Sequence, residues 1–286
     1  MMNKYIVKSN AKVSVYSNIV GVNNGIWNIE TLIFPIDLFD IIEIKLSNNY
    51  KINVQYTDTN NTIKTSEKCI NAVKKIMEYC NEFQGVDILI HKKIPISSGL
   101  GGESSNMVTI LYVMNTLLKT DISVEKLMNI CYQAGNDTYF FSYNQPICMI
   151  SKRIYPFPIE SKNFPFLCMI IDPNIHFVDS KTKYILSKKF NLSNKKIDLK
   201  RYFEIWTNKD LSEINNSLMS FITKDTIPEY NKAFIISDDI YNLCGFRPVF
   251  TGSGPFMILF VDKNLKQLLS SYCKQNNIKF YFTKLL

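Results

Sequence analysis

The sequence predicts a mixed α+β protein of two domains, and three observations lead to this prediction. The chain has 286 residues, of which 46% are hydrophobic, so it can bury one large core or two smaller ones. Segments with the two-residue alternation of strands are interspersed with segments that have the three- and four-residue spacing of helices. A polar stretch with several prolines, at 155–165, separates the two halves. We therefore expect domains at residues 1–158 and 159–286.

The individual elements follow from where β-branched and aromatic residues alternate, and from where apolar residues recur at helical spacing. In the first half we expect strands at 4–20, 27–35, 41–47, 51–57 and 86–93, and helices at 66–82, after residue 106, and at 123–134. In the second half we expect strands at 147–153, 166–171, 256–261 and 278–283, and helices near 180–187, 208–222, 229–243 and 264–275.

The composition excludes several classes of protein. No run of about 18 apolar residues is present, and the N-terminal segment lacks the apolar stretch of a signal peptide, so we expect a cytoplasmic protein with no membrane partner. The seven cysteines form no CxxC pair, and His91 and His176 are too few for a multi-histidine metal site. The thiols are therefore expected to be reduced and mostly buried.

The charge balance favours anionic partners only weakly. The 33 Lys and Arg residues outnumber the 25 Asp and Glu residues, which gives a net charge of +8. The lysines are scattered except for a denser stretch at 181–201, which we interpret as solvated surface. Three arginines are few for gripping a nucleic acid, so no nucleic-acid partner is expected. We expect a monomer or a homodimer.

The segment Pro95-Ile-Ser-Ser-Gly-Leu-Gly-Gly-Glu-Ser-Ser-Asn106 is the most informative part of the sequence. Gly99, Gly101 and Gly102 follow an expected strand and precede an expected helix. Glycines let backbone N–H groups turn toward a ligand, and the helix N-terminus adds partial positive charge, which together are typical of a phosphate-binding loop. The segment is neither a Walker A loop nor a dinucleotide fingerprint, because no Gly-Lys-Ser/Thr follows and Ser104 replaces the third glycine. A plain glycine turn capped by serine is the alternative.

Several motifs, spread over most of the chain, resemble those of the GHMP kinase superfamily. These are the loop at 95–106, Ser9-Asn-Ala-Lys12, Gly135-Asn-Asp137 with Phe140-Phe141, and Thr251-Gly-Ser-Gly-Pro255. Asn24-Gly25, followed by Glu30-Thr31-Leu32, also resembles the substrate-binding segment of one branch, which phosphorylates a cytidine-linked alcohol in non-mevalonate isoprenoid biosynthesis. The matching order and intervals are more specific than the loop alone.

The resemblance implies both a fold and a reaction. The fold is the two-domain GHMP kinase fold, with an N-terminal domain similar to ribosomal protein S5 domain 2 and a ferredoxin-like C-terminal domain. The reaction is the transfer of the γ-phosphoryl group of ATP, with Mg²⁺, to a hydroxyl of a small alcohol. In the cytidine-linked branch the acceptor is a 2-hydroxyl.

The resemblance also assigns roles to residues. Asp137 matches the family's catalytic base, and Lys12 matches the lysine that accompanies this base. An aspartate can accept the proton of the acceptor hydroxyl as the new bond forms, and a lysine ammonium offsets the negative charge on the oxygens. The implied phosphate-binding residues are Pro95, Gly99, Leu100, Gly101, Gly102, Glu103, Ser104, Ser105 and Asn106, with Ser104 or Ser105 helping to hold the metal. The implied substrate-binding residues are Ser14, Gly25, Ile26, Trp27, Gly252, Ser253 and Gly254.

Two departures from the family pattern leave the substrate open. Ile26 and Trp27 replace the Tyr-His pair with which the branch grips cytosine; Trp27 can stack, but nothing obvious replaces the histidine. Glu103 stands where the loop has a further glycine. If the Glu103 carboxylate lay beside a phosphate, the repulsion between the two charges would cost up to about 4 kcal/mol. If it faced solvent in the first helical turn, its negative charge would be tolerated. A third arrangement is that it ligates Mg²⁺. A kinase for another small alcohol and a non-catalytic binding protein of this fold remain alternatives.

Overall fold

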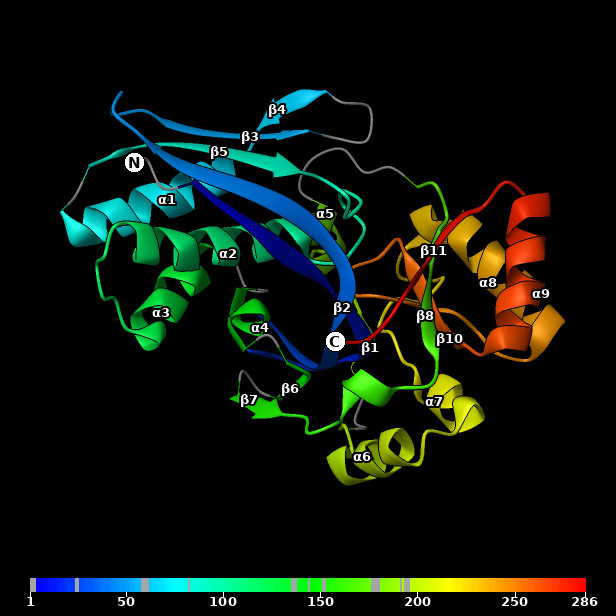
Figure 1. Ribbon diagram of the computed structural model, residues 1–286. Coiled ribbons are helices and arrows are strands. Elements are labelled where there is room, and N and C mark those ends of the chain that lie inside the picture. The colour runs from blue at the N-terminus through cyan, green and yellow to red at the C-terminus, as the bar shows by residue number, and fades with distance from the viewer. Residues whose placement is uncertain are drawn as a thin grey trace. The chain divides into compact units, whose positions relative to one another are not determined.

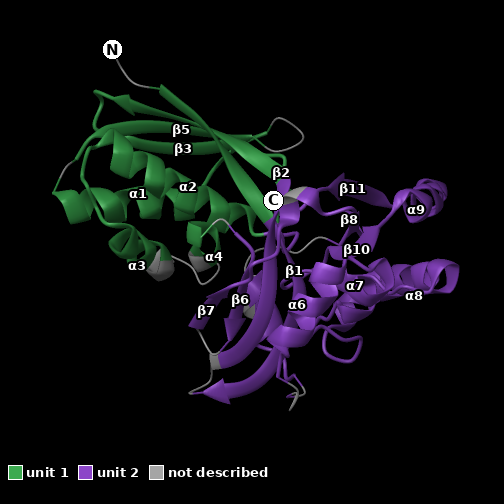
Figure 2. Cartoon of the chain, turned by 60° about the horizontal axis from the view of Figure 1, so that its bottom comes forward, with its two compact units in different colours: residues 1–11, 38–96, 101–144 green, residues 12–37, 97–100, 145–286 purple. Residues whose placement is uncertain are grey.

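The chain has the expected α+β class, as the computed structural model in Figure 1 shows. The structure describes residues 4–23, 26–57, 62–81, 83–134, 138–143, 145–150, 153–175, 181–190, 192 and 196–286. Contacts divide the chain into two compact units that interleave along the sequence (Figure 2). Unit 1 comprises residues 1–11, 38–96 and 101–144, and unit 2 comprises residues 12–37, 97–100 and 145–286. The domain boundary expected at 158 stays a prediction.

Unit 1 is a sheet packed against helices. Its strands are the first part of β1 (Lys4–Asn23), the second part of β2 (Ile26–Ser47), β3 (Ile52–Thr57), β4 (Ile63–Thr65) and β5 (Gly85–His91). Its helices are α1 (Glu67–Cys80), α2 (Gly102–Leu117), α3 (Val124–Ala134) and α4 (Thr138–Tyr143). β3 pairs parallel with β5, which is possible because α1 is the crossover between them, and β5 pairs antiparallel with β2.

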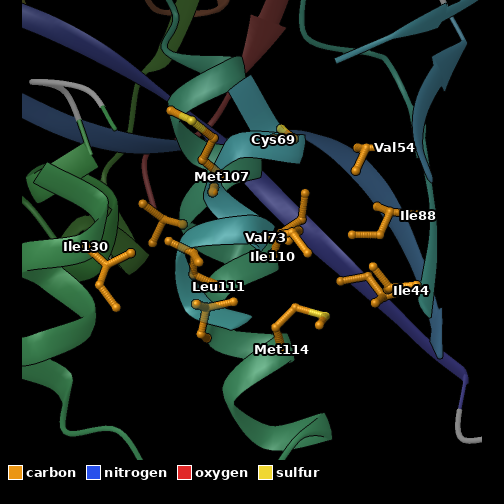
Figure 3. Close-up of a cluster of buried hydrophobic side chains, with 14 of the residues drawn as sticks. Ile44, Val54, Cys69, Val73, Ile88, Met107, Ile110, Leu111, Met114 and Ile130 are labelled. Atoms are coloured by element: carbon orange, nitrogen blue, oxygen red, sulfur yellow. The ribbon is translucent and has the colours of Figure 1, made fainter. Parts of the chain in front are cut away.

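The core of unit 1 lies between these helices and the sheet (Figure 3). Cys69 and Val73 of α1 lie one turn apart, and α2 contributes Met107, Ile110, Leu111 and Met114. The strands contribute β-branched side chains that alternate along each strand, among them Ile44, Val54 and Ile88. In both helices the buried side chains recur at spacings of three and four residues, as expected for helices that pack on a core.

Unit 2 contains an antiparallel sheet in the order β11-β8-β10-β9. Its elements are β8 (Leu167–Asp172), β9 (Val249–Phe250), β10 (Met257–Val261), β11 (Lys279–Thr283), α5 (Lys181–Leu186), α6 (Leu199–Asn208), α7 (Leu211–Ser217), α8 (Asn231–Cys244), α9 (Lys263–Gln275) and the 3₁₀ turns η1 (Ser161–Asn163) and η2 (Pro228–Tyr230). The remaining strands are β6 (Ile147–Ile150) and β7 (Arg153–Pro156), which extend from the first part of β2.

An aromatic cluster fills part of the interior of unit 2. Trp206 of α6 is fully buried, and its ring stacks on those of Phe34 and Phe164, with centroids 4.5 and 5.4 Å away. Phe260 of β10 meets the same indole edge to face at 5.3 Å. This cluster therefore joins β2, the segment before β8, α6 and β10.

Several expected elements differ from the structure. The helix expected at 208–222 is shorter in the structure: α7 begins after its N-cap Asp210 and ends at Ser217, and Met219 pairs with Tyr16 of β1. The helix α6 before it, which ends ahead of Lys209 at a left-handed φ of 54°, was not expected. The strands expected at 27–35 and 41–47 form the single strand β2, and the strand expected at 147–153 is the hairpin β6–β7. The helix α4 was not expected.

The cysteines behave as the composition predicted. All seven are free; Cys69, Cys131, Cys148, Cys168 and Cys273 are buried, and Cys80 and Cys244 are half-buried. Within the described part of the chain, no helix is long and apolar enough to cross a bilayer.

Candidate functional site

In unit 2, the N-terminal motif lies along the glycine loop that precedes α2. The backbone N–H of Lys12 donates to the carbonyl of Leu100 at 3.0 Å. The Lys12 side chain is buried, and its ammonium donates to the Ser14 hydroxyl at 3.2 Å. The Ser14 N–H in turn donates to the Thr251 hydroxyl at 2.8 Å. Three motifs that are far apart in sequence are therefore in direct contact.

The two glycine loops of unit 2 touch through their backbones. Gly99, at a φ of 88°, leaves no room for a side chain, because a Cβ there would collide with the Thr251 carbonyl. Gly252, at a φ of 57°, lies so close that a Cβ would be 2.8 Å from the Lys12 ammonium and 2.9 Å from the Gly99 carbonyl. Glycine is thus required at both positions by conformation and by space. The loop ends in a cis peptide bond between Gly254 and Pro255.

Lys181, at the start of α5, is a site residue that sequence analysis missed. It falls in the lysine-rich stretch interpreted as solvated surface, and for this residue that interpretation is wrong because its side chain is buried. Its ammonium donates to the carbonyl of Ser97 at 2.7 Å and to the carbonyl of Gly254. Lys181 lies at the start of the helix expected near 180–187, where no repeated apolar spacing indicates which side chains are buried.

In unit 1, the glycine loop continues into the N-terminus of α2. Gly101 is the N-cap residue, at a left-handed φ of 73°, and the first bond of the helix runs from the Ser105 N–H to its carbonyl at 3.0 Å. The N–H groups of Gly102, Glu103 and Ser104 precede that bond, and glycine has no side chain with which to cap them. The Lys92 ammonium lies 3.1 Å from where a Cβ of Gly102 would stand. This turn of α2 therefore presents backbone donors, and the Lys92 ammonium beside them is paired with a carboxylate.

A buried carboxylate holds this turn in place. Asp40 of β2 is fully buried, forms an ion pair with Lys92, and accepts from the N–H groups of Lys93 and Ile94 at 2.8 and 2.9 Å. It also accepts from the side-chain amide of Asn106 at 3.0 Å. Sequence analysis missed Asp40, which lies just before the strand expected at 41–47 and becomes part of a strand only in the continuous β2.

The side chains that follow Gly102 have different partners. Glu103 is half-exposed and pairs with Lys68 of α1 at 2.5 Å, so its carboxylate lies on the outside of the first helical turn. The Ser105 hydroxyl donates to the Asn10 carbonyl at 2.6 Å and accepts from Ser9 at 2.8 Å, so it ties α2 to β1. Asn106 is held by Asp40, and its Oδ1 is buried without a hydrogen-bond partner among the described residues. Ser104 and Pro95 are half-buried.

The residues that the resemblance assigned to the substrate lie partly outside the described chain. Gly25 is outside it, and so is the side chain of Ile26. Trp27 is half-buried; its indole N–H donates to the Leu186 carbonyl of α5 at 2.5 Å, and its ring meets Phe190 edge to face at 5.5 Å. Its polar group is therefore already engaged by the protein.

Further contacts fix the second glycine loop around Ser253. The Tyr230 hydroxyl donates to the Ser253 carbonyl at 2.7 Å, and burial raises the pKa of this phenol well above its ordinary value. Tyr230 therefore stays a neutral donor at physiological pH. Asp137, assigned as the catalytic base, lies outside the described residues. Among the described residues, no three His, Cys, Asp or Glu side chains gather as a metal-binding group.

Comparison with known proteins agrees with these features. Residues 65–148 match the GHMP kinases N terminal domain. A 4-diphosphocytidyl-2-C-methyl-D-erythritol kinase of Clostridium perfringens (strain 13 / Type A) is 26% identical over 266 residues, which cover 91% of this chain and 89% of that protein. The protein of the same name from Finegoldia magna is 27% identical over 285 residues, covering 96% and 97% of the two chains.

Solved structures share the fold. A crystal structure of 4-(cytidine 5'-diphospho)-2C-methyl-D-erythritol kinase superposes with a TM-score of 0.74 at 15% identity, over 98% of this chain and 99% of that one. The mevalonate kinase of Methanococcus jannaschii superposes with a TM-score of 0.70 at 16% identity, over 99% of both chains. Residues 65–148 of this chain are therefore similar to the GHMP kinases N terminal domain, and the whole chain shares the fold of these solved kinases.

Proposed function

We propose that this protein transfers the γ-phosphoryl group of ATP to a hydroxyl of a small alcohol. The observation that carries the proposal is the contact of three motifs in unit 2, where the Lys12 ammonium lies beside Gly252 and Gly252 lies against Gly99. A buried ammonium beside two glycine-rich backbones suits a ligand that brings several negative charges. The related kinases of similar length support the same class of reaction.

The phosphates of ATP fit the turn where α2 begins. The N–H groups of Gly102, Glu103 and Ser104 precede the first bond of the helix, and the Lys92 ammonium lies beside Gly102. Such a turn binds anions because its N–H groups and the helix dipole both favour negative charge. The Glu103 carboxylate is paired with Lys68, so it does not have to be displaced before a phosphate binds.

Mg²⁺ would be held mainly by the phosphates. This ion commonly takes one or two protein oxygens and completes its shell with phosphate oxygens and water. The Ser105 hydroxyl is engaged with β1, so we assign the protein hydroxyl to Ser104 rather than to Ser105. When bound, the ion supplies neutralisation of charge on the transferring group.

Lys12 and Asp137 would act on the acceptor. In phosphoryl transfer the protein mainly positions the reactants and neutralises charge, and the acceptor hydroxyl loses its proton late. Asp137 would accept this proton, and the Lys12 ammonium would stabilise the oxygen anion that develops. Lys12 is suited to this role because Ser14 and the Leu100 carbonyl fix its position.

For the acceptor, we propose the 2-hydroxyl of 4-diphosphocytidyl-2-C-methyl-D-erythritol, in isoprenoid precursor biosynthesis, as in the related kinases' name. One observation favours a second candidate, a different small alcohol. The Trp27 N–H is held by the Leu186 carbonyl and so is not available to recognise a base. A site that lacks paired polar groups discriminates poorly between bases.

An ADP-release assay with a panel of alcohols tests this proposal. We expect Mg²⁺-dependent ADP release with the cytidine-linked substrate, and Asp137→Asn should lower kcat at least about 10²-fold, because general base catalysis contributes about that much. The substitution is nearly isosteric, so the melting temperature should stay within a few degrees. Asp121→Asn, a surface control, should retain full activity.

The other outcomes separate the candidates. ADP release with another alcohol alone supports the second candidate. No ADP release with any alcohol, although the protein binds ATP, supports a non-catalytic binding protein and contradicts the kinase proposal.

A further inference from the structure

The buried Lys181 side chain contacts both glycine loops, and the proposed reaction assigns it no role. Its side chain is buried, and its ammonium donates to the carbonyl of Ser97 in the first glycine loop and to the carbonyl of Gly254 in the second. Both loops and Lys181 belong to unit 2. One cation therefore joins two segments that are more than 150 residues apart in the sequence.

The two carbonyls come from residues in left-handed backbone conformations. Ser97 has a φ of 57° and Gly254 a φ of 59°. For a serine this conformation is unfavourable, so a group that binds its carbonyl helps to keep it there. A charged donor is well suited to this, because its hydrogen bonds are stronger than those of a neutral donor.

The two loops also approach each other closely at Gly99 and Gly252. Gly99 packs under the Thr251 carbonyl, and Gly252 packs against the Gly99 carbonyl and the Lys12 ammonium. The Lys181 ammonium binds one carbonyl of each loop, that of Ser97 and that of Gly254, and so holds the two backbones together beside this contact. The position of Gly252, and with it the surroundings of Lys12, therefore depends on the contacts that Lys181 makes.

The geometry points to Lys181 as a positioning residue, whose ammonium clamps the two glycine loops in the arrangement that phosphoryl transfer requires. It acts through the loops rather than on the reacting atoms. This role rests on the proposed kinase function. An uncharged side chain of similar length would leave both carbonyls without their donor, whereas an arginine would keep the charge and several donors.

Hydrogen exchange together with kinetics tests this role. The variants are Lys181→Met, Lys181→Arg and the control Lys189→Met, which removes an exposed lysine in the loop that follows α5. Lys181→Met should speed amide exchange at least tenfold in residues 97–100 and 251–254. It should lower kcat by about 10²-fold, since a displacement of about 1 Å can cost that much. The KM for the alcohol should change by less than about threefold.

The conservative variant separates positioning from mere stability. Lys181→Arg should recover most of kcat and of the exchange protection, and Lys189→Met should match the wild type in both. If Lys181→Met fails to fold, Lys181→Gln, which removes the charge but keeps an amide donor, takes its place, and its effects should have the same direction but be smaller. Unchanged exchange in both loops would overturn the clamp, and faster exchange with unchanged kcat would overturn the positioning role. A wild-type protein without phosphotransferase activity refutes the proposed function instead, and the exchange measurement still decides whether Lys181 joins the loops.

Discussion

At the scale of single residues, the role that a side chain can take in this site depends on the protein groups that it already contacts. Glu103 is the clearest case, because a carboxylate in a phosphate-binding loop looks harmful in the sequence. In the structure it pairs with Lys68 across the surface between α1 and α2. The position in the first turn then becomes favourable, because a negative charge near a helix N-terminus is stabilised by the helix dipole.

The first prediction concerns this residue. Glu103→Gln should leave the affinity for Mg·ATP within about twofold of the wild type, because the carboxylate is turned toward Lys68, and exposed pairs of this kind contribute about 1 kcal/mol or less. Isothermal titration calorimetry measures the affinity. Lys68→Met is the matched control and should behave in the same way. Binding that tightens tenfold in Glu103→Gln would mean that the carboxylate faces the phosphates.

Asp40 shows what sequence patterns at the residue scale miss. Its four donors come from Lys92, Lys93, Ile94 and Asn106, and none of these contacts has a periodic signature. Asn106 was assigned to phosphate by resemblance, yet its amide is held by this carboxylate. The motif could be recognised from the sequence. Which of its side chains bind a ligand and which hold the loop in place depends on contacts between residues that are 52 to 66 positions apart.

At the scale of elements, Asp40 joins β2, the loop after β5, and α2. Asp40→Asn removes the charge and leaves the Lys92 ammonium buried without its counter-ion. Breaking a buried pair in this way costs about 3–5 kcal/mol. Differential scanning calorimetry should therefore show a melting temperature lower by roughly 10 °C.

The control for Asp40→Asn is Asp238→Asn. Asp238 pairs with Arg247 on the surface, with about half of each side chain exposed. Its loss should change the melting temperature by no more than about 2 °C. Equal effects of the two substitutions would show that the buried pair does not hold the start of α2.

Elements with one continuous apolar face could be predicted well. α1 is the example: its buried side chains recur at helical spacing, and it packs against β3 of the sheet and against α2. The end of the helix expected at 208–222 could not be predicted, because the chain leaves the helix after Ser217 and Met219 pairs with β1, a contact between segments far apart in the sequence. β2 continues through Pro35 and Asp37, residues that usually end a strand, because the C-terminal segment pairs with it there.

At the scale of the whole molecule, the buried thiols make stability depend on pH in the alkaline range. Burial raises the pKa of Cys69 and Cys273 to about 11 and that of Cys131 and Cys148 to about 12. Below the ordinary thiol pKa of 9 these groups are neutral in both states. Above it the unfolded chain loses protons that the folded chain keeps, so the free energy of unfolding falls as the pH rises toward 11 to 12.

Urea unfolding at about pH 8 and about pH 10.5 measures this effect, and we expect a lower midpoint at the higher pH. Cys148→Ala should weaken the pH dependence, because it removes one such thiol. Equal midpoints at both pH values would contradict the expected effect of the buried thiols.

The kinase proposal as a whole depends on whether the start of α2 receives the phosphates of a nucleotide. Hydrogen exchange of the wild-type protein with and without Mg·AMPPNP, a non-hydrolysable ATP analogue, measures this directly. We predict that the nucleotide slows exchange at least tenfold at the amides of Gly102, Glu103 and Ser104. If saturating nucleotide leaves the exchange of these three amides unchanged, or protects only other segments, the claim that the start of α2 binds the phosphates is contradicted.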